Sequence, residues 1–249
     1  MTWTFLNKKK AKRSAMLRKQ FISIGHASGT ITFLSVILVA CILMFCPYVD
    51  AAALDLDSFP IKIGDSAVPK SAWEIIMGNR RMYGVSKEGT RTILHTLSAG
   101  KNICVGKKIS LSLSEFPLLS WAWKAVVLPD GAREDVKKKN DSAAGIIIAI
   151  KQGFTLHAIK YVWSSSLAVG SIVQDGPNAY DKVIVLQSGA IHCGTWISEK
   201  VNVRDDIKRC FGERFNRIDG ISIMTDSDNT HSKAEAFYAD ISFLPGPIK

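Results

Sequence analysis

The sequence predicts an all-β protein: a β-sandwich or jelly roll with one or two short helices, preceded by an N-terminal apolar signal or anchor helix. Past residue 53, apolar side chains recur at every second position in a series of segments, which is the spacing of a strand with one buried face. Gly, Pro, Asn and Asp fall between these segments and mark turns. Many short strands with little helix favour a single sandwich.

The N-terminal region has the order of a secretory signal. Residues 1–30 hold 7 of the 32 basic residues and no acid, an apolar run follows over residues 31–45, and small residues come next at 51–53. A run of about 15 residues is long for a signal-peptide core and short of the roughly 20 that span a bilayer. Residues 1–53 are therefore predicted to be a signal peptide, with an uncleaved signal anchor as the alternative.

Both alternatives place the rest of the chain outside the cytoplasm. The basic end stays inside, and residues 54–249, predicted to be one β-sandwich domain, cross the membrane. We therefore expect a periplasmic or otherwise exported protein. If the signal is not cleaved, residues 31–46 anchor the protein to the inner membrane.

The positive charge does not indicate a nucleic-acid partner. The whole chain carries a formal charge of +10, but residues 54–249 hold 25 basic and 21 acidic residues, a net of only +4. A nucleic-acid-binding surface needs a stronger basic patch than this balance provides. We therefore expect no nucleic-acid partner.

Three cysteines follow the predicted signal: Cys104, Cys193 and Cys210. Export permits a disulfide, but three cysteines cannot all pair within one chain. Their spacing matches no Cys/His zinc motif, which disfavours a structural zinc site.

The predicted strands are segments in which apolar and polar residues alternate, or short and almost wholly apolar runs. In order they are residues 108–116, 120–128, 143–151, 154–163, 181–189, 194–203, 219–228 and 234–244. The segment 143–151 is almost wholly apolar, so we expect it to be a central strand buried on both faces.

Two segments are predicted to be helical. Residues 203–213 place apolar side chains at i, i+4, i+7 and i+8, and Gly212 can end the helix. Residues 70–79 are a second and weaker candidate. The charged segment 133–141 is predicted to be a solvated loop.

Four blocks occur in an order that carries a family likeness: "FPLLSWAWK", "YVW", "GTWISEKVNVRDDIKRCFGE" and "IDGISIMTDSDNTHSKAEAFYADI". Together they resemble the bacterial domain-of-unknown-function family 3047, over roughly residues 73–243. The resemblance implies a galactose-binding-like jelly roll and export, and it favours glycan binding without implying an established activity. In the family we expect a paired acid before the strand that begins at Ala143 and a basic residue after it. This chain has Asn140-Asp141 and Gly145 at these positions, so a role for such a charged pair is without support here.

The most distinctive stretch is the tip between the last two predicted strands. Asp226 and Asp228 project to one side of a strand, and with Asn229 they offer the hard oxygen ligands that calcium prefers. The same groups suit sugar hydroxyls, an acid/base pair, or a turn held by side chains that bond nearby backbone amides. Asp240 could face this tip across a hairpin.

Aromatic residues are the second set of candidate ligand contacts. The tryptophans that fall on predicted strands or strand ends are Trp121, Trp123, Trp163 and Trp196. Indole rings can stack on the C–H faces of sugars, but tryptophan is also a large core residue. The chain also holds Tyr161, Phe237 and Tyr238. We expect most of these aromatic residues in the core and one or two at a groove.

These observations favour a non-catalytic binding domain for a carbohydrate or glycoconjugate of the bacterial envelope. One alternative is a glycan-active enzyme that uses Asp226 and Asp228, and another is a structural interaction protein of the envelope. We assign no catalytic residue and no cofactor other than a possible calcium ion at Asp226 and Asp228. The common motifs of nucleotide triphosphatases, α/β-hydrolases and zinc proteases do not occur.

Overall fold

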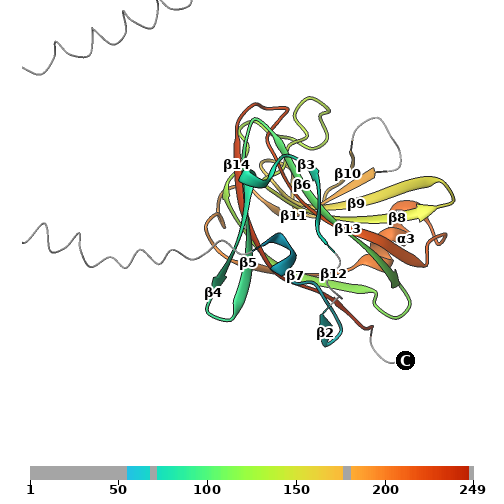
Figure 1. Ribbon diagram of the computed structural model, residues 1–249. Coiled ribbons are helices and arrows are strands. Elements are labelled where there is room, and N and C mark those ends of the chain that lie inside the picture. Colours follow the sequence, from blue (N-terminus) through green and yellow to red (C-terminus); the bar gives the residue numbers. More distant parts are fainter. Residues whose placement is uncertain (1–54, 68–71, 176–180, 247–249) are drawn as a thin grey trace, which may run out of the picture. The chain divides into compact units, whose positions relative to one another are not determined.

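The structure is a computed structural model that describes residues 55–67, 72–175 and 181–246 (Figure 1). The predicted signal or anchor over residues 1–53 lies outside the described residues. Within the described ranges, no helix is long and apolar enough to cross a membrane.

Two seven-stranded sheets make up the described part of the chain (Figure 1). Sheet A contains β1 (Lys62–Ile63), β2 (Ser66–Ala67), β4 (Tyr83–Glu88), β5 (Arg91–Ala99), β7 (Leu118–Val127), β12 (Ile197–Asn202) and β14 (Lys233–Leu244). Sheet B contains β3 (Glu74–Met77), β6 (Asn102–Ser112), β8 (Ala144–Gln152), β9 (Thr155–Ser164), β10 (Ile172–Gln174), β11 (Asp181–Ser188) and β13 (Arg217–Asp226).

Strand β14 lies at the centre of sheet A. One edge of β14 pairs antiparallel with β7, and the other edge pairs first with β5, antiparallel, and then with β1, parallel. Strands β4 and β12 extend the sheet beyond β5 and β7. Sheet B has the order β10-β11-β9-β8-β13-β6-β3, and within it β11 and β9 run parallel.

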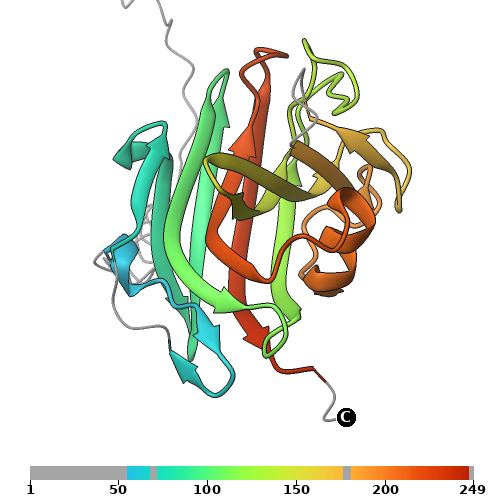
Figure 2. The ribbon, with the colours of Figure 1, turned by 90° about the vertical axis from the view of Figure 1, so that its right-hand side faces the viewer.

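The two sheets pack face to face through large aromatic side chains. Trp121 and Trp123 on β7 of sheet A contact Tyr161 and Trp163 on β9 of sheet B, with ring centroids 5.8 Å apart for Trp121–Tyr161 and 6.1 Å for Trp123–Trp163. All four side chains are buried. Figures 1 and 2 show the strands of both sheets around this interior. The predicted β-sandwich is confirmed, whereas its finer assignment as a galactose-binding-like jelly roll stays a prediction.

The predicted helix near residue 203 is confirmed as α3 (Val203–Phe211), drawn in orange in Figure 2. Asn202 caps it, because its side-chain oxygen accepts the backbone N–H of Asp205. The helix ends at Gly212, whose φ of 85° favours glycine. Its apolar face packs into the core. Two short 3-10 helices, η1 (Leu56–Ser58) and η2 (Arg80–Met82), complete the regular structure of the described ranges.

The second predicted helix, over residues 70–79, is wrong. Residues Glu74–Met77 form β3, an edge strand of sheet B that pairs with β6. Among the described residues 72–79 only Trp73 is buried, and its indole N–H donates to the carbonyl of Phe59 at 3.0 Å. Pairing with the free edge of β6 outweighs the weak helical pattern, since tertiary context overrides propensity.

The expectation for strand 143–151 holds in part. Strand β8 is flanked by β9 and β13, so it is an inner strand. Its even-numbered isoleucines face the core, while Ile147 and Ala149 on the opposite face are only half-buried. The strand is therefore buried fully on one face and partly on the other.

The segment 133–141 is a loop, but the prediction that it is simply solvated is wrong. Glu134 is buried and accepts the hydroxyls of Ser142 at 3.0 Å and Ser164 at 2.6 Å. Asp141 is buried as well. These two carboxylates anchor the loop because a buried carboxylate is retained only where hydrogen bonds satisfy it.

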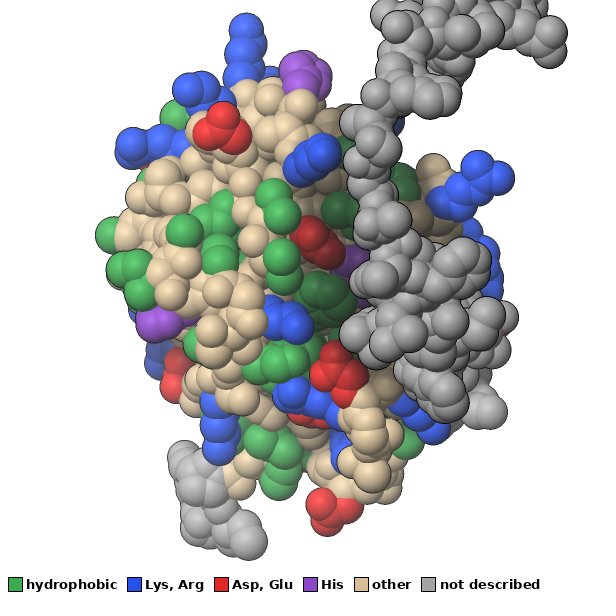
Figure 3. All heavy atoms as spheres, turned by 90° about the vertical axis from the view of Figure 1, so that its left-hand side faces the viewer, with side chains coloured by type: hydrophobic (Ala, Val, Ile, Leu, Met, Phe, Trp, Pro, Cys, Tyr) green, Lys and Arg blue, Asp and Glu red, His purple; other side chains and the backbone are tan. Residues whose placement is uncertain are grey.

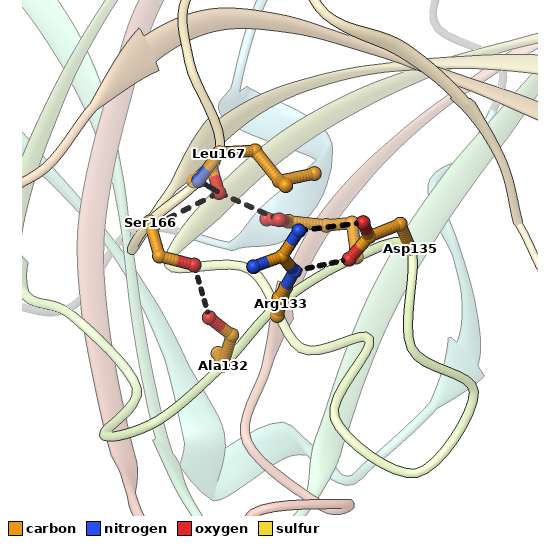
Figure 4. A network of polar contacts seen from close by, with 7 residues as sticks. Ala132, Arg133, Asp135, Ser166 and Leu167 are labelled. Carbon is orange, nitrogen blue, oxygen red and sulfur yellow. Dashed lines mark hydrogen bonds and ion pairs between the residues drawn. The ribbon is translucent and has the colours of Figure 1, made fainter.

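Further bonds tie this loop to the segment after β9 (Figure 4). The hydroxyl of Ser166 donates to the carbonyl of Ala132 at 2.9 Å. The Ser164 hydroxyl, which donates to Glu134 of the loop, also accepts the backbone N–H of Leu167 at 3.0 Å. At the exposed end of the loop, the Arg133 guanidinium bonds both carboxylate oxygens of Asp135. The loop therefore has a buried anchor and an exposed ion pair.

All three cysteines of the described part are free. Burial raises the pKa of the Cys104 thiol to about 11, and it also raises the pKa values of Cys193 and Cys210. A thiol with a raised pKa is a weak nucleophile at neutral pH. The cysteines therefore act as packing residues in this fold.

Candidate functional site

The tip between β13 and β14 brings together the predicted polar residues. Asp226 ends β13, and Asp228 and Asn229 follow in the turn. Asp141, from the loop before β8, joins them: carboxylate oxygens of Asp141, Asp226 and Asp228 all lie within 4.8 Å of one another. The contribution of Asp141 was not predicted, because it is far from the tip in sequence.

Most of the tip's carboxylate oxygens already accept hydrogen bonds. Asp141 accepts the backbone N–H groups of Asn229 at 3.1 Å and Thr230 at 2.7 Å, and the Thr230 hydroxyl at 2.6 Å. Asp226 accepts the side-chain amide of Asn102 at 2.9 Å and the backbone N–H of Asp228 at 3.3 Å. These bonds fix the path of the turn, which is the ordinary role of such side chains in turns.

A buried lysine supplies positive charge near this cluster. Burial raises the pKa of Asp226 to about 7 against the attraction of Lys160, and Asp228 and Asp141 raise the pKa further by repulsion. Lys160 on β9 is itself buried. Its chain passes beside Gly145, where an added Cβ would lie 3.4 Å from Cε of Lys160, an ordinary van der Waals contact.

The acids of the tip are thus largely engaged within the protein, although the buried Oδ1 of Asn102 has no hydrogen-bond partner in the described ranges. Four hollows of the described part have other linings. The bonds within the tip favour a structural turn. A calcium ion at Asp226 and Asp228 stays a prediction.

The predicted tryptophans divide between the core and the surface. Trp121, Trp123 and Trp163 are buried between the sheets, so a ligand at the surface cannot contact them. Trp196, just before β12, is only half-buried. It is the one tryptophan of the predicted set that a surface ligand can reach.

Asp240 does not face the tip, and that expectation is wrong. Its carboxylate forms an ion pair with Arg91, whose Nε lies 2.7 Å from Oδ2 of Asp240. Arg91 begins β5, whereas Ala99 at the opposite end of β5 pairs with Lys233 beside the tip. Asp240 therefore lies at the far end of sheet A from the tip.

Arg91 connects the two remaining predicted residues. Its guanidinium carbon lies 4.4 Å from the centroid of the Trp196 ring while the same group pairs with Asp240. Trp196 and Asp240, which the sequence singled out separately, therefore belong to one cluster. A guanidinium so close to an indole ring is a favourable cation–π contact.

The cluster continues across the outer face of sheet A. Tyr238 on β14 and Trp123 on β7 point into the core, so their neighbours Phe237 and Lys124 point outward. Nζ of Lys124 lies 4.4 Å from the ring centroid of Phe237 and 5.1 Å from that of Trp196.

A histidine–glutamate pair ends the cluster on β5 and β14. The ring of His95 stacks on Phe237 with centroids 4.3 Å apart and an interplanar angle of 13°. Nε2 of His95 lies 2.8 Å from Oε1 of Glu235. We call the whole cluster the outer row; its members are Asp240, Arg91, Trp196, Lys124, Phe237, His95 and Glu235.

The outer row is accessible from solvent. Its two aromatic rings and Lys124 are half-buried. Figure 3 shows the side of the molecule on which β4, β5 and β14 lie, and there apolar, acidic, basic and histidine side chains gather near the middle of the face. The row therefore combines apolar ring surface with charged hydrogen-bonding groups.

A hollow of about 470 Å³ adjoins the row at Arg91 and Asp240. Its other polar lining residues are Lys62, Asp65, Thr90, Thr92 and Ser242. Asp240 has a left-handed φ of 56°, and there the pairing of β14 with β7 shifts between Ala239 and Ser242. A non-glycine residue in this conformation carries some strain, and here it directs a carboxylate to the rim of a hollow.

The sequence contained a signal for the row that the prediction missed. Glu235 and Phe237 alternate with the core residues Ala236 and Tyr238 on one predicted strand, so they had to share the outer face. An aromatic residue on the polar face of an amphipathic strand is that signal. Which residues of β5 and β7 join the row depends on how these strands pair with β14 and in what register. The alternation of apolar and polar residues does not specify that register.

Among curated proteins, none matches this chain. Several solved structures do. The carbohydrate-binding module TmCBM61, solved with β-1,4-galactotriose, is 8% identical over 71% of this chain and 90% of that chain, with a TM-score of 0.34. The xyloglucanase domain of NopAA from Sinorhizobium fredii, solved with cellobiose, is 12% identical over 70% and 91%, with a TM-score of 0.39.

A family 12 xyloglucanase from Bacillus licheniformis is 8% identical over 69% of this chain and 99% of that chain, with a TM-score of 0.36. Likenesses this weak do not bear on what this chain binds or does.

The sequence likeness to a family is stronger. The model of the family described as "Protein of unknown function (DUF3047)" matches residues 72–242, a range that includes both the tip and the outer row. The chain therefore belongs to the DUF3047 family.

Proposed function

We propose that this chain is an exported envelope protein whose sandwich, of the galactose-binding-like jelly-roll type, binds carbohydrate without catalysis. The outer row and its adjoining hollow are the proposed binding site. One observation carries the proposal: half-exposed aromatic rings alternate with charged groups along a sheet face and lead into a hollow lined by hydroxyl and charged side chains.

Sugars match such a surface chemically. A sugar ring has apolar C–H faces that pack on aromatic rings, and hydroxyls that need hydrogen-bond partners. Binding sites for small molecules combine aromatic lining with a few polar groups that fix orientation, in clefts of about 300–1,000 Å³. The hollow of about 470 Å³ falls within this range.

A catalytic role for the tip has less support. Glycoside hydrolysis places two carboxyl groups about 5–10 Å apart across a bound sugar ring, but the carboxylates of the tip are engaged in holding its turn. One observation favours the alternative of a glycan-active enzyme: burial raises the pKa of Asp226 to about 7, which suits a general acid at neutral pH. Asp226 is only 3% exposed, however, which hinders access to a substrate.

Glycan binding is tested with the full-length chain on a panel of envelope and plant polysaccharides, with calcium and with chelator. Trp196→Ala and Phe237→Ala remove the ring surface of the row. Phe154→Ala removes a fully exposed aromatic side chain from the β8–β9 hairpin of sheet B and is the matched control.

We expect both row variants to lose about tenfold or more in affinity, since aromatic residues dominate such contacts, and the control to bind as the parent does. Equal binding by all four proteins would remove the row from the proposal. Failure of the parent to bind any glycan would favour the structural alternative.

Export is tested separately. A fusion of residues 1–60 to a reporter that is active only outside the cytoplasm should give activity, because the order of charge and apolarity in residues 1–53 is that of a signal. Mass spectrometry of the mature N-terminus then distinguishes cleavage near Ala51–Ala53 from an uncleaved anchor. A silent fusion would contradict export.

A further inference from the structure

The three basic side chains of the outer row differ in one respect. Arg91 pairs with Asp240, and His95 contacts Glu235. Lys124 lies between the rings of Phe237 and Trp196 and forms no ion pair within the ranges that the structure describes. The centre of the row therefore carries a positive charge that no carboxylate balances.

The surroundings of Lys124 make this charge available to a ligand. Two aromatic rings hold the ammonium group near their faces, which stabilises the cation without neutralising it. The side chain is half-buried, so it is less hydrated than a free surface lysine. A charged hydrogen bond in such a place is stronger than one between neutral groups.

The acids of the row do not compete for this position. Glu235 and Asp240 lie at its two ends, where Asp240 pairs with the Arg91 guanidinium and Glu235 contacts the His95 ring. An anion at the centre of the row would meet Lys124 first, beside the rings of Trp196 and Phe237.

We propose that the outer row binds a polysaccharide that carries carboxylates, such as a polymer of hexuronic acids. The sugar ring packs on the exposed surface of Trp196 beside the edge of Phe237, whose two faces contact His95 and Lys124, and its carboxylate accepts a hydrogen bond from Nζ of Lys124. This assignment rests on the proposed function and adds the class of ligand to it.

The test measures binding of the full-length chain to matched polysaccharides. Polygalacturonate and its fully methyl-esterified form share one backbone and differ in charge. Hyaluronan and dextran add a second uronate polymer and a second neutral polymer, and dextran sulfate adds an anion of another kind. Lys124→Met removes the charge and keeps a long apolar chain. Lys151→Met, on the exposed end of β8 in sheet B, is the matched control.

We expect the parent to bind at least one uronate polymer more tightly than the neutral polymers. Lys124→Met should weaken uronate binding about tenfold to a hundredfold, the effect of losing a hydrogen bond to a charged group, and should weaken binding to esterified polygalacturonate much less. Lys151→Met should bind as the parent does.

The other outcomes separate the two proposals. Equal binding of neutral and uronate polymers, with no effect of Lys124→Met, would overturn this assignment and leave carbohydrate binding in place. Preference for dextran sulfate over every uronate polymer would also overturn it. If no polysaccharide binds, carbohydrate binding itself fails, and this inference fails with it.

Discussion

Charged side chains gather in two regions of this protein, and they do so in opposite ways. At the tip, Asp141 and Asp226 are buried and bonded to the backbone and amides of the turn. In the outer row, charged groups contact ring faces and one another at a half-exposed surface. The tip holds the denser set of acids, but most of their oxygens already accept hydrogen bonds from the protein. In the row, half-exposed rings and charged groups remain accessible to an external partner.

The number of acids in a stretch is therefore a poor guide to function. A buried carboxylate must receive its hydrogen bonds from the protein itself. The carboxylates of a dense, buried acidic turn are therefore occupied in holding the turn. Partial exposure beside apolar surface leaves groups free to bind.

The largest effect should come from Asp141→Ala. The variant leaves the backbone N–H groups of Asn229 and Thr230 without their acceptor, and we expect the free energy of unfolding to fall by about 3 kcal/mol. For a domain of this size the melting temperature falls by about 6–12 °C. Thermal unfolding followed by circular dichroism measures it.

Asp135→Ala in the same loop is the control, because it removes only an exposed ion pair with Arg133. Such pairs contribute about 0–1 kcal/mol. Equal melting of the two variants would show that Asp141 does not hold the tip, and the contrast between the regions would be lost.

The second effect concerns pH. Burial raises the pKa of Asp226 to about 7 from an unfolded value of 3.8, so the folded state binds this proton more tightly than the unfolded state does. Its contribution to stability is therefore present at low pH and is lost as the pH rises from about 4 to about 7. Between pH 5 and pH 8, the stability of the parent relative to Asp226→Asn should fall by about 2 kcal/mol.

Urea unfolding of both proteins across this range measures the difference, and other titrating groups cancel in it. A difference that is constant with pH would mean that Asp226 titrates normally and that the tip is more open to solvent than its burial indicates.

The smallest effect is expected from calcium. Because most oxygens of the tip already accept hydrogen bonds, we expect calcium and chelator to give the parent the same melting temperature. A bound ion present at a hundred times its Kd would raise the free energy of unfolding by about 2.7 kcal/mol. A rise of that size, absent from Asp228→Asn, would restore the calcium site and make the tip a binding region like the row.

Local patterns explain what could be predicted from the sequence. Helix α3 follows from its spacing and from Gly212 next to its end, and most strands follow from alternation. The missed parts join distant segments. Asp141 and Thr230 are 89 residues apart, and Arg91 and Asp240 are 149 residues apart. No short-range pattern specifies such pairs, because they depend on which strands become neighbours and in what register.

The position of β14 has a consequence for how the protein forms. This last strand separates β5 from β7, and it also pairs with β1 near the start of the described part. Until residues 233–244 have been synthesised, the earlier strands of sheet A have no common neighbour. Pairings over such sequence separations are slow to form, so we expect the chain to remain without a complete sheet A until its final segment is available. The export proposed above, in which the chain would be threaded unfolded across a membrane, would benefit from that delay, since the tertiary structure cannot close before strand β14 is available.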